Sequence, residues 1–197
     1  GKKKKVISNI KIPINGLHNI RNSTAAAAVA FSIGISSKLI KKGLKNFKGV
    51  ERRFNFLFNY RGSIFIDDYA HHPTEIMEVL NGVKEVYKKR EVICIFQPHR
   101  LSRLKNLRKQ FAKSFKKADV VILCPIYKAG ENIKININYN NFAKEIIKYS
   151  NVNLILIKDQ FELSKYIKKC IHGQKIVIGM GAGSISNWMR MLPSLVK

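Results

Sequence analysis

The 197-residue sequence contains no uninterrupted apolar run close to the roughly 20 residues needed to cross a bilayer. Its basic start, GKKKKVISNI, is followed by short apolar pieces and by no small-residue cleavage site. We therefore expect no membrane span and no signal peptide. Together with a cysteine pattern that fits the cytosol, these two expectations predict a cytoplasmic protein.

Cysteine is scarce as well. The three cysteines, Cys94, Cys124 and Cys170, are an odd number, and they are widely spaced in apolar surroundings. This pattern argues against a disulfide framework or a zinc site and predicts reduced thiols in the core.

Several motifs of enzyme active sites are missing. There is no G-x-S-x-G and no cysteine beside a base, so nothing indicates nucleophilic catalysis. There is also no G-x-x-x-x-G-K-[ST], the loop whose lysine and hydroxyl hold phosphate and Mg²⁺. The stretch GMGAGS has glycines at 179, 181 and 183, but residue 184 is serine, so G-x-G-x-x-G is incomplete. A tight turn between a strand and a helix is the favoured interpretation.

Acidic residues are few: 12 Asp and Glu stand against 37 Lys and Arg, a formal net charge of +25. Such a charge attracts phosphate backbones, so a basic nucleic-acid-binding module is one hypothesis. Two observations weaken it, because most of the charge is lysine and it is spread over every predicted helix. We expect anionic ligands but no specific nucleic acid.

From about residue 51 the sequence alternates apolar strands with amphipathic helices. Apolar strands that are each followed by a helix predict an α/β fold, a Rossmann-like and mostly parallel sheet with helices on both faces. The expected strands are 54–58, 63–67, 91–97, 119–125, 153–157 and 175–180. The expected helices are 73–89, 101–117, 142–149, 160–170 and 185–192.

The first 50 residues follow a different pattern. Residues 6–14, VISNIKIPI, predict a strand. A helix should follow, capped by Asn22, Ser23 or Thr24 and ended by Gly34, and then a second amphipathic helix over residues 36–47. A domain boundary is therefore expected between residues 50 and 51.

Ligands of parallel sheets bind at the carboxyl ends of the strands, and polar residues follow three of the predicted strands. In DDYAHHPTE, Asp67 and Asp68 end a strand and Pro73 stands where a helix begins. The two acids point to opposite sides of the strand, so they should not share a proton. His71 and His72 lack the i,i+4 spacing of helical zinc ligands, so a metal site there is the weaker reading.

The second strand end is FQPHRLSR, with Gln97, His99, Arg100 and Arg103. Arginines at a helix start oppose the helix dipole, so they need another reason to be there. Binding a carboxylate or a phosphate is the natural one. The loop YKAGE, after the next strand, again holds a tyrosine and an acid.

The stretches HNIRN, FKGVERRF, DDYAHHPTEI, FQPHRLSR, YKAGE and GAGSI, in this order, resemble the Mur ligase family over nearly all of the chain. The resemblance implies an ATP-dependent acid–amino-acid ligase, in particular the member that joins L-alanine to UDP-N-acetylmuramate through an acyl phosphate in peptidoglycan synthesis. The murein-peptide recycling ligase of the same family is the alternative. Residues 1–50 would be the end of the central ATPase domain and residues 51–197 the complete C-terminal domain.

The resemblance also implies roles for individual residues. ATP would contact His18, Asn19, Asn22, Arg53 and Asp68. The L-alanine pocket would be formed by Tyr69, His71, His99, Arg100 and Arg103. Of these residues, Arg53, His71 and Arg100 are the catalytic candidates. Because the Mg²⁺ ligands and the P-loop would lie in upstream N-terminal and central domains, this chain should hold no metal and should not be active alone.

Overall fold

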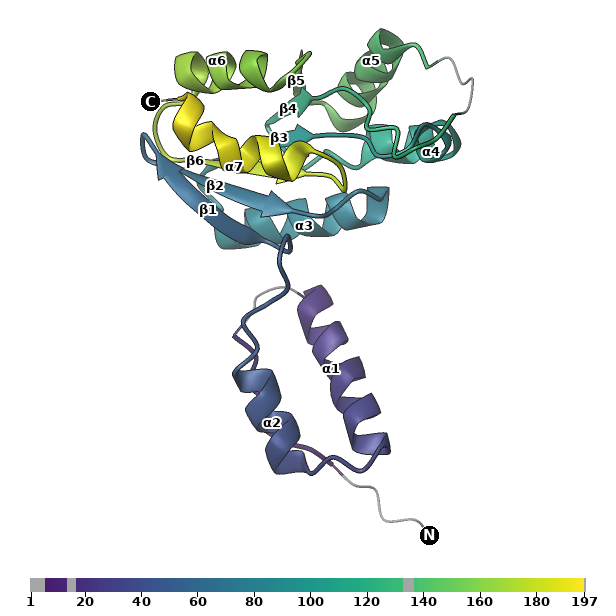
Figure 1. The fold of residues 1–197 in the computed structure, drawn as a ribbon, viewed down its shortest axis with the longest axis vertical. Coiled ribbons are helices and arrows are strands. Elements are labelled where there is room, and N and C mark those ends of the chain that lie inside the picture. The colour runs from purple at the N-terminus through teal and green to yellow at the C-terminus, as the bar shows by residue number, and fades with distance from the viewer. Residues whose placement is uncertain (1–5, 14–16, 133–136, 197) are drawn as a thin grey trace. The chain divides into compact units, whose positions relative to one another are not determined.

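The computed structural model describes residues 6–13, 17–132 and 137–196, and the side chains of residues 17 and 18 fall outside the description. The chain divides into two compact units, residues 1–50 and 51–197 (Figure 1). We describe each unit by itself. The assignment of the first unit to a central ATPase domain stays a prediction.

The first unit contains two helices, α1 (Leu17–Ser32) and α2 (Ser37–Lys45). The hydroxyl of Ser36 caps α2 by accepting a hydrogen bond from Leu39 N at 3.4 Å. Two sequence predictions are wrong here. Helix α1 begins at Leu17 rather than near Asn22. Residues 6–13 form no strand, because no other described segment pairs with them and Asn9 has a φ of 57°.

The second unit is built on a six-stranded sheet in the order β1-β2-β6-β3-β4-β5. Every neighbouring pair is parallel except β1 and β2, which form an antiparallel hairpin. The predicted α/β sheet is therefore confirmed, with one antiparallel edge strand. The strands are β1 (Asn55–Tyr60), β2 (Ser63–Asp68), β3 (Glu91–Phe96), β4 (Val120–Leu123), β5 (Asn153–Leu156) and β6 (Lys175–Met180).

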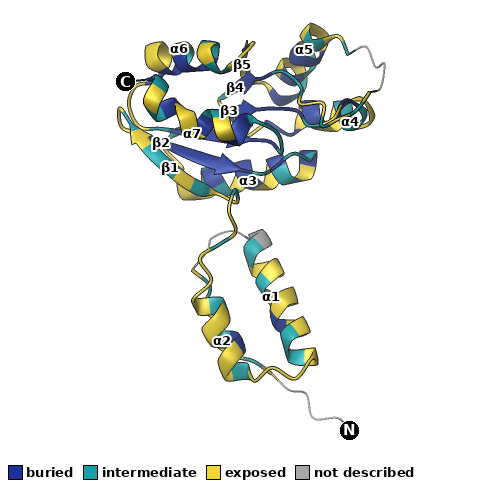
Figure 2. Ribbon diagram, in the orientation of Figure 1, coloured by how far each residue is buried: buried dark blue, intermediate teal, exposed yellow. Residues whose placement is uncertain are grey.

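Helices cover both faces of this sheet (Figure 2). Neighbouring residues along a strand point to opposite faces. Ile66 of β2 packs in one core with α3, α4 and α5, whereas Phe65 packs in the other core with α6 and α7. The helices are α3 (Pro73–Val86), α4 (Leu101–Lys113), α5 (Tyr139–Ser150), α6 (Gln160–Cys170) and α7 (Ile185–Leu195).

The cysteines are free thiols, as predicted, but only two of them lie in the core. Cys94 and Cys124 are buried, and burial raises the pKa of Cys124 to about 12, so both stay protonated and inert. Cys170 is exposed at the end of α6, so its predicted core position is wrong. Over the described residues, no helix is long and apolar enough to cross a membrane.

Candidate active site

Four rings from three loops form a row at the carboxyl ends of the strands. Tyr69 and His71 follow β2, His99 follows β3, and Tyr127 follows β4. Successive ring centroids in this order are 5.1, 5.7 and 5.7 Å apart, and the last pair is stacked with an interplanar angle of 14°. The structure therefore brings together the three strand ends that the sequence singled out, those after β2, β3 and β4.

Asp68 is the last residue of β2 and lies at this edge of the sheet. Its carboxylate is 3% exposed and accepts hydrogen bonds from Ala70 N at 2.7 Å and Phe54 N at 2.8 Å. Burial raises the pKa of this carboxyl, while the two N–H groups oppose the shift. Asp68 thus ties the start of the loop to the segment before β1. Its contact with ATP stays a prediction.

The structure explains two residues that sequence reasoning left without a role. His72 is the N-cap of α3, and its Nδ1 accepts from Thr74 N at 3.4 Å. Asp67 is fully buried against α7, where its Oδ2 accepts from the hydroxyl of Ser186 and lies 3.8 Å from Arg190 Nη2. Asp67 and Asp68 therefore have separate partners. Both His72 and Asp67 therefore hold local structure.

His71 has a defined orientation in the row. Its Nδ1 lies 2.9 Å from the carbonyl oxygen of Tyr69 and 3.4 Å from Glu75 Oε2, and both of these atoms can only accept. The Nδ1 atom therefore carries a proton. In the neutral ring, Nε2 is left with a free lone pair.

The second predicted loop supplies the positive charge. Arg103 Nη1 lies 3.3 Å from His99 Nδ1, and since a guanidinium only donates, this Nδ1 accepts. Burial lowers the pKa of His99, and the positive charges of Arg103, of His71 when it is protonated, and of Arg100 lower it further, whereas Glu131 raises it. His99 is thus a neutral imidazole that carries its proton on Nε2.

An NMR titration of His99 should therefore give a pKa below the usual value of about 6.5. Because the folded ring then binds fewer protons than the unfolded one, its contribution to stability is full above about pH 6.5. That contribution declines as the pH falls from there toward the folded pKa. Arg103→Ala should raise the pKa, since it removes the nearest cation. An equal or higher pKa in the unmodified protein would contradict this electrostatic account.

Two arginines from the segment before β1 flank the other end of the row. The guanidinium carbons of Arg52 and Arg53 lie 4.6 and 5.6 Å from the ring centroid of Tyr69. Arg52 also donates from Nη2 to the carbonyl oxygen of Gly181 at 2.7 Å. The sequence analysis selected Arg53 and missed Arg52, which joins the Tyr69 loop to the glycine turn after β6.

The glycine turn after β6 is tightly packed, as a tight strand-to-helix turn requires. Gly181 has a φ of 149°, and a Cβ there would lie 2.8 Å from the carbonyl oxygen of Gln97. The Gln97 side chain holds the start of α7, because Oε1 accepts from Ile185 N at 3.0 Å and Nε2 donates to Ser184 Oγ at 3.0 Å. This turn binds the β3 and β6 strand ends to each other.

The residues predicted to contact the adenine side of ATP lie in the other unit. Asn19 and Asn22 are both on α1, and Asn22 is exposed. The side chain of His18 is outside the described part of the chain. Their roles stay predictions. Among the described residues, no group of three His, Cys, Asp or Glu side chains could hold a metal ion.

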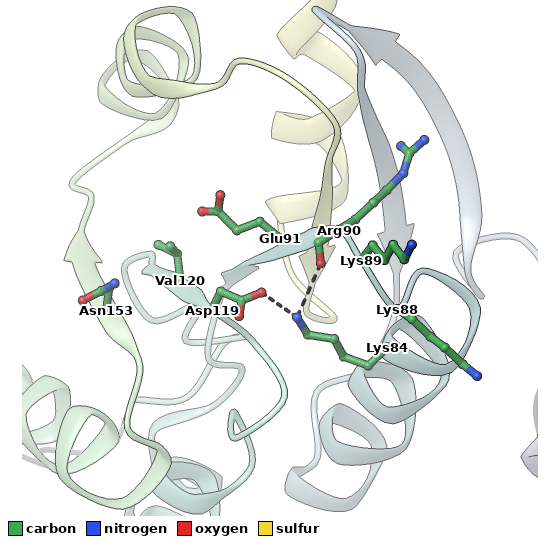
Figure 3. Close-up of a pocket in the computed structure, with 8 residues that line it drawn as sticks. All are labelled: Lys84, Lys88, Lys89, Arg90, Glu91, Asp119, Val120 and Asn153. Carbon is green, nitrogen blue, oxygen red and sulfur yellow. Dashed lines mark hydrogen bonds and ion pairs between the residues drawn. The ribbon is translucent and has the colours of Figure 1, made fainter.

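A pocket of about 390 Å³ lies at the opposite edge of the sheet, around the first residues of β3, β4 and β5. Figure 3 shows Lys84 directed toward Asp119 and the carbonyl oxygen of Arg90. Asp119 Oδ2 also accepts from Val92 N at 2.7 Å, and Glu91 pairs with Lys175. The acids of this pocket are therefore engaged in aligning the strand starts.

Comparison with known proteins finds similar sequences over nearly the whole chain. The family model described as "Mur ligase, glutamate ligase domain" matches residues 52–183. The UDP-N-acetylmuramate–L-alanine ligase of Pelagibacter ubique is 66% identical over 100% of this chain and 42% of its own length. That of Bartonella tribocorum is 41% identical over 95% of this chain and 39% of its own. The chain thus spans about two fifths of these relatives.

Solved structures extend the likeness. The UDP-N-acetylmuramate–alanine ligase of Thermotoga maritima superposes with a TM-score of 0.74 at 29% identity, over 94% of this chain and 39% of that one. A murein peptide ligase from Psychrobacter arcticus gives a TM-score of 0.75 at 22% identity, over 95% and 38%. The second comparison shows a common fold.

Proposed function

Because this chain belongs to the Mur ligase family, we propose that it supplies the amino-acid site of a cytoplasmic ATP-dependent ligase that joins L-alanine to UDP-N-acetylmuramate. The observation that carries the proposal is the cluster of Arg100, Arg103 and neutral His99, facing His71 and Tyr69 at the carboxyl ends of β2 and β3. A site of this kind suits a small molecule that has both a carboxylate and an amine.

The arginines would bind the carboxylate of L-alanine. Only one N–H of Arg103 is used by His99, and a guanidinium has five, so a planar pair of donors is left for a carboxylate. Arg100 is exposed at the start of the same helix and adds a second positive charge.

His71 would receive the proton that the amine of L-alanine must lose. The Nδ1 atom is directed to the Tyr69 carbonyl oxygen, so the Nε2 lone pair is the acceptor. The amine then attacks the activated carboxylate of the UDP-sugar. An amide bond forms as the carbon–oxygen bond to phosphate breaks, and inorganic phosphate leaves.

ATP supplies the phosphoryl group that activates this carboxylate. Arg53 is exposed beside Tyr69 and would contact the phosphates of ATP. The nucleoside of ATP would be bound by Asp68, His18, Asn19 and Asn22. Mg²⁺ would be held by the domains that the relatives carry outside the matched region, since the described residues offer no metal cluster. UDP-N-acetylmuramate would also bind there.

The test is a full-length chimera in which this chain replaces the matching part of the Pelagibacter ubique ligase. We expect release of inorganic phosphate that depends on ATP, UDP-N-acetylmuramate and L-alanine together, and no turnover by the chain alone. A folded chimera without alanine-dependent turnover would overturn the proposal. Faster turnover with a murein tripeptide than with L-alanine would identify a murein-peptide ligase instead.

A further inference from the structure

The loop after β4, residues 125–131, contacts the proposed site although neither the sequence nor the comparisons assign it a role. Tyr127 N donates to the carbonyl oxygen of Pro98 at 2.8 Å, and Arg100 N donates to that of Tyr127 at 2.8 Å. These two bonds extend the parallel pairing of β3 and β4 beyond the strands, with His99 opposite Tyr127. The two rings consequently stack at 5.7 Å.

Glu131, at the end of this loop, caps α4. The N-cap residue Arg100 makes no side-chain cap bond and has a φ of 70°, which is unfavourable for arginine. Glu131 fills this role, since Oε2 accepts from Ser102 N at 3.1 Å and Oε1 accepts from the Ser102 hydroxyl. The hydrogen bond from that hydroxyl is also the main reason why the pKa of Glu131 is lowered, so the cap is a carboxylate.

The negative charge matters because of where α4 begins. Arg100 and Arg103 place two cations at a helix N-terminus, where the dipole disfavours them. An anion that bonds to the first turn offsets this repulsion before any substrate carboxylate arrives. Glu131 thereby keeps the helix start, and the arginines on it, in a fixed position.

Tyr127 also lies close to Gly183. A Cβ on Gly183 would lie 2.5 Å from Tyr127 Cγ and 2.5 Å from Gln97 Oε1. Only glycine at this position therefore leaves space for Tyr127 beside the turn after β6. The glycine turn after β6 therefore helps to position Tyr127.

We propose that Glu131 and Tyr127 are positioning residues of the amino-acid site, Glu131 through the arginines of α4 and Tyr127 through His99. The inference rests on the proposed function and adds the specific residues on which its substrate affinity depends. Neither residue needs to touch L-alanine.

The experiment measures KM for L-alanine and for ATP in the full-length chimera. We expect Glu131→Gln and Tyr127→Ala each to raise the alanine KM about tenfold and to leave the ATP KM within about twofold. Tyr127→Phe should restore most of the affinity, because it retains the ring. Glu145→Gln is the matched control: it removes one acid that pairs with Arg108 of α4 away from the row of rings, and its alanine KM should not change.

A second readout uses the 197-residue chain and requires no activity. Tyr127→Ala should move the NMR titration midpoint of His99 upward, because the ring that shields the imidazole is removed. An unchanged alanine KM in Glu131→Gln and Tyr127→Ala, alongside a raised KM in Arg103→Ala, would overturn this inference and leave the proposed function standing. If Arg103→Ala also leaves the alanine KM unchanged, the proposed amino-acid site itself is wrong.

Discussion

Replacing Arg103 by alanine in the full-length chimera is expected to raise the alanine KM by about 30-fold. A charge-assisted, two-pronged contact between a guanidinium and a carboxylate contributes about 2 kcal/mol, and each 1.4 kcal/mol is a factor of ten. The ATP KM should stay within about twofold, because the substituted side chain bonds to His99 rather than to the proposed nucleotide residues. Steady-state kinetics with each substrate varied in turn measures both constants.

Arg108→Ala is the matched control for this experiment. Arg108 lies on the same helix, but its Nε pairs with Glu145 of α5 at 2.8 Å, so the change removes one arginine without touching the site. A salt bridge whose two side chains are 30% and 35% exposed contributes at most about 1 kcal/mol to the free energy of unfolding. Equal effects of the two substitutions on the alanine KM would indicate a general loss of positive charge, and the carboxylate clamp at Arg103 would be refuted.

The second large effect concerns stability. Gly181→Ala should lower the free energy of unfolding by about 3 kcal/mol, since two penalties of about 1–3 kcal/mol act together. A φ of 149° is rarely adopted by L-residues, and the new Cβ would lie 2.8 Å from the backbone oxygen of Gln97. Urea unfolding followed by the fluorescence of Trp188, the only tryptophan, reports on the helix that begins at this turn.

Gly82→Ala provides the contrast. Gly82 lies inside α3, and apart from its own turn of the helix no atom of the described residues stands within 4 Å of the position of the added Cβ. Alanine at a helix interior is favoured over glycine by about 1 kcal/mol, so the same chemical change should stabilise the unit. A loss of stability similar to that of Gly181→Ala would show that neither the backbone angle nor the close approach causes the effect.

The sheet was predictable because its strands are uniformly apolar and each is followed by a helix. Position along such a chain also predicts that DDYAHHPTE and FQPHRLSR lie at one edge of the sheet. The secondary structure of the first unit was harder to predict, because residues 6–13 resemble a strand in composition but pair with no other described segment. The residue pattern of one segment does not show whether a neighbouring strand exists to form hydrogen bonds with its backbone.

The missed residues share one property: their partners are distant in sequence. Glu131 bonds to Ser102, 29 positions away, and Asp67 bonds to Ser186, 119 positions away. The YKAGE loop was recognised as a polar strand end, yet its acid could not be matched to a helix start from spacing alone. His72 is the exception, since a polar residue directly before Pro73 is a recognisable helix cap.

The strand order has a consequence for how the protein is made. β6 comes last in the chain but lies between β2 and β3, and it is hydrogen-bonded to both. While a ribosome is still translating the residues before Lys175, the β1–β2 hairpin and the β3–β4–β5 layer have no shared strand to join them. The sheet can close only after β6 has emerged from the ribosome, so the hairpin and the β3–β4–β5 layer cannot join before that point.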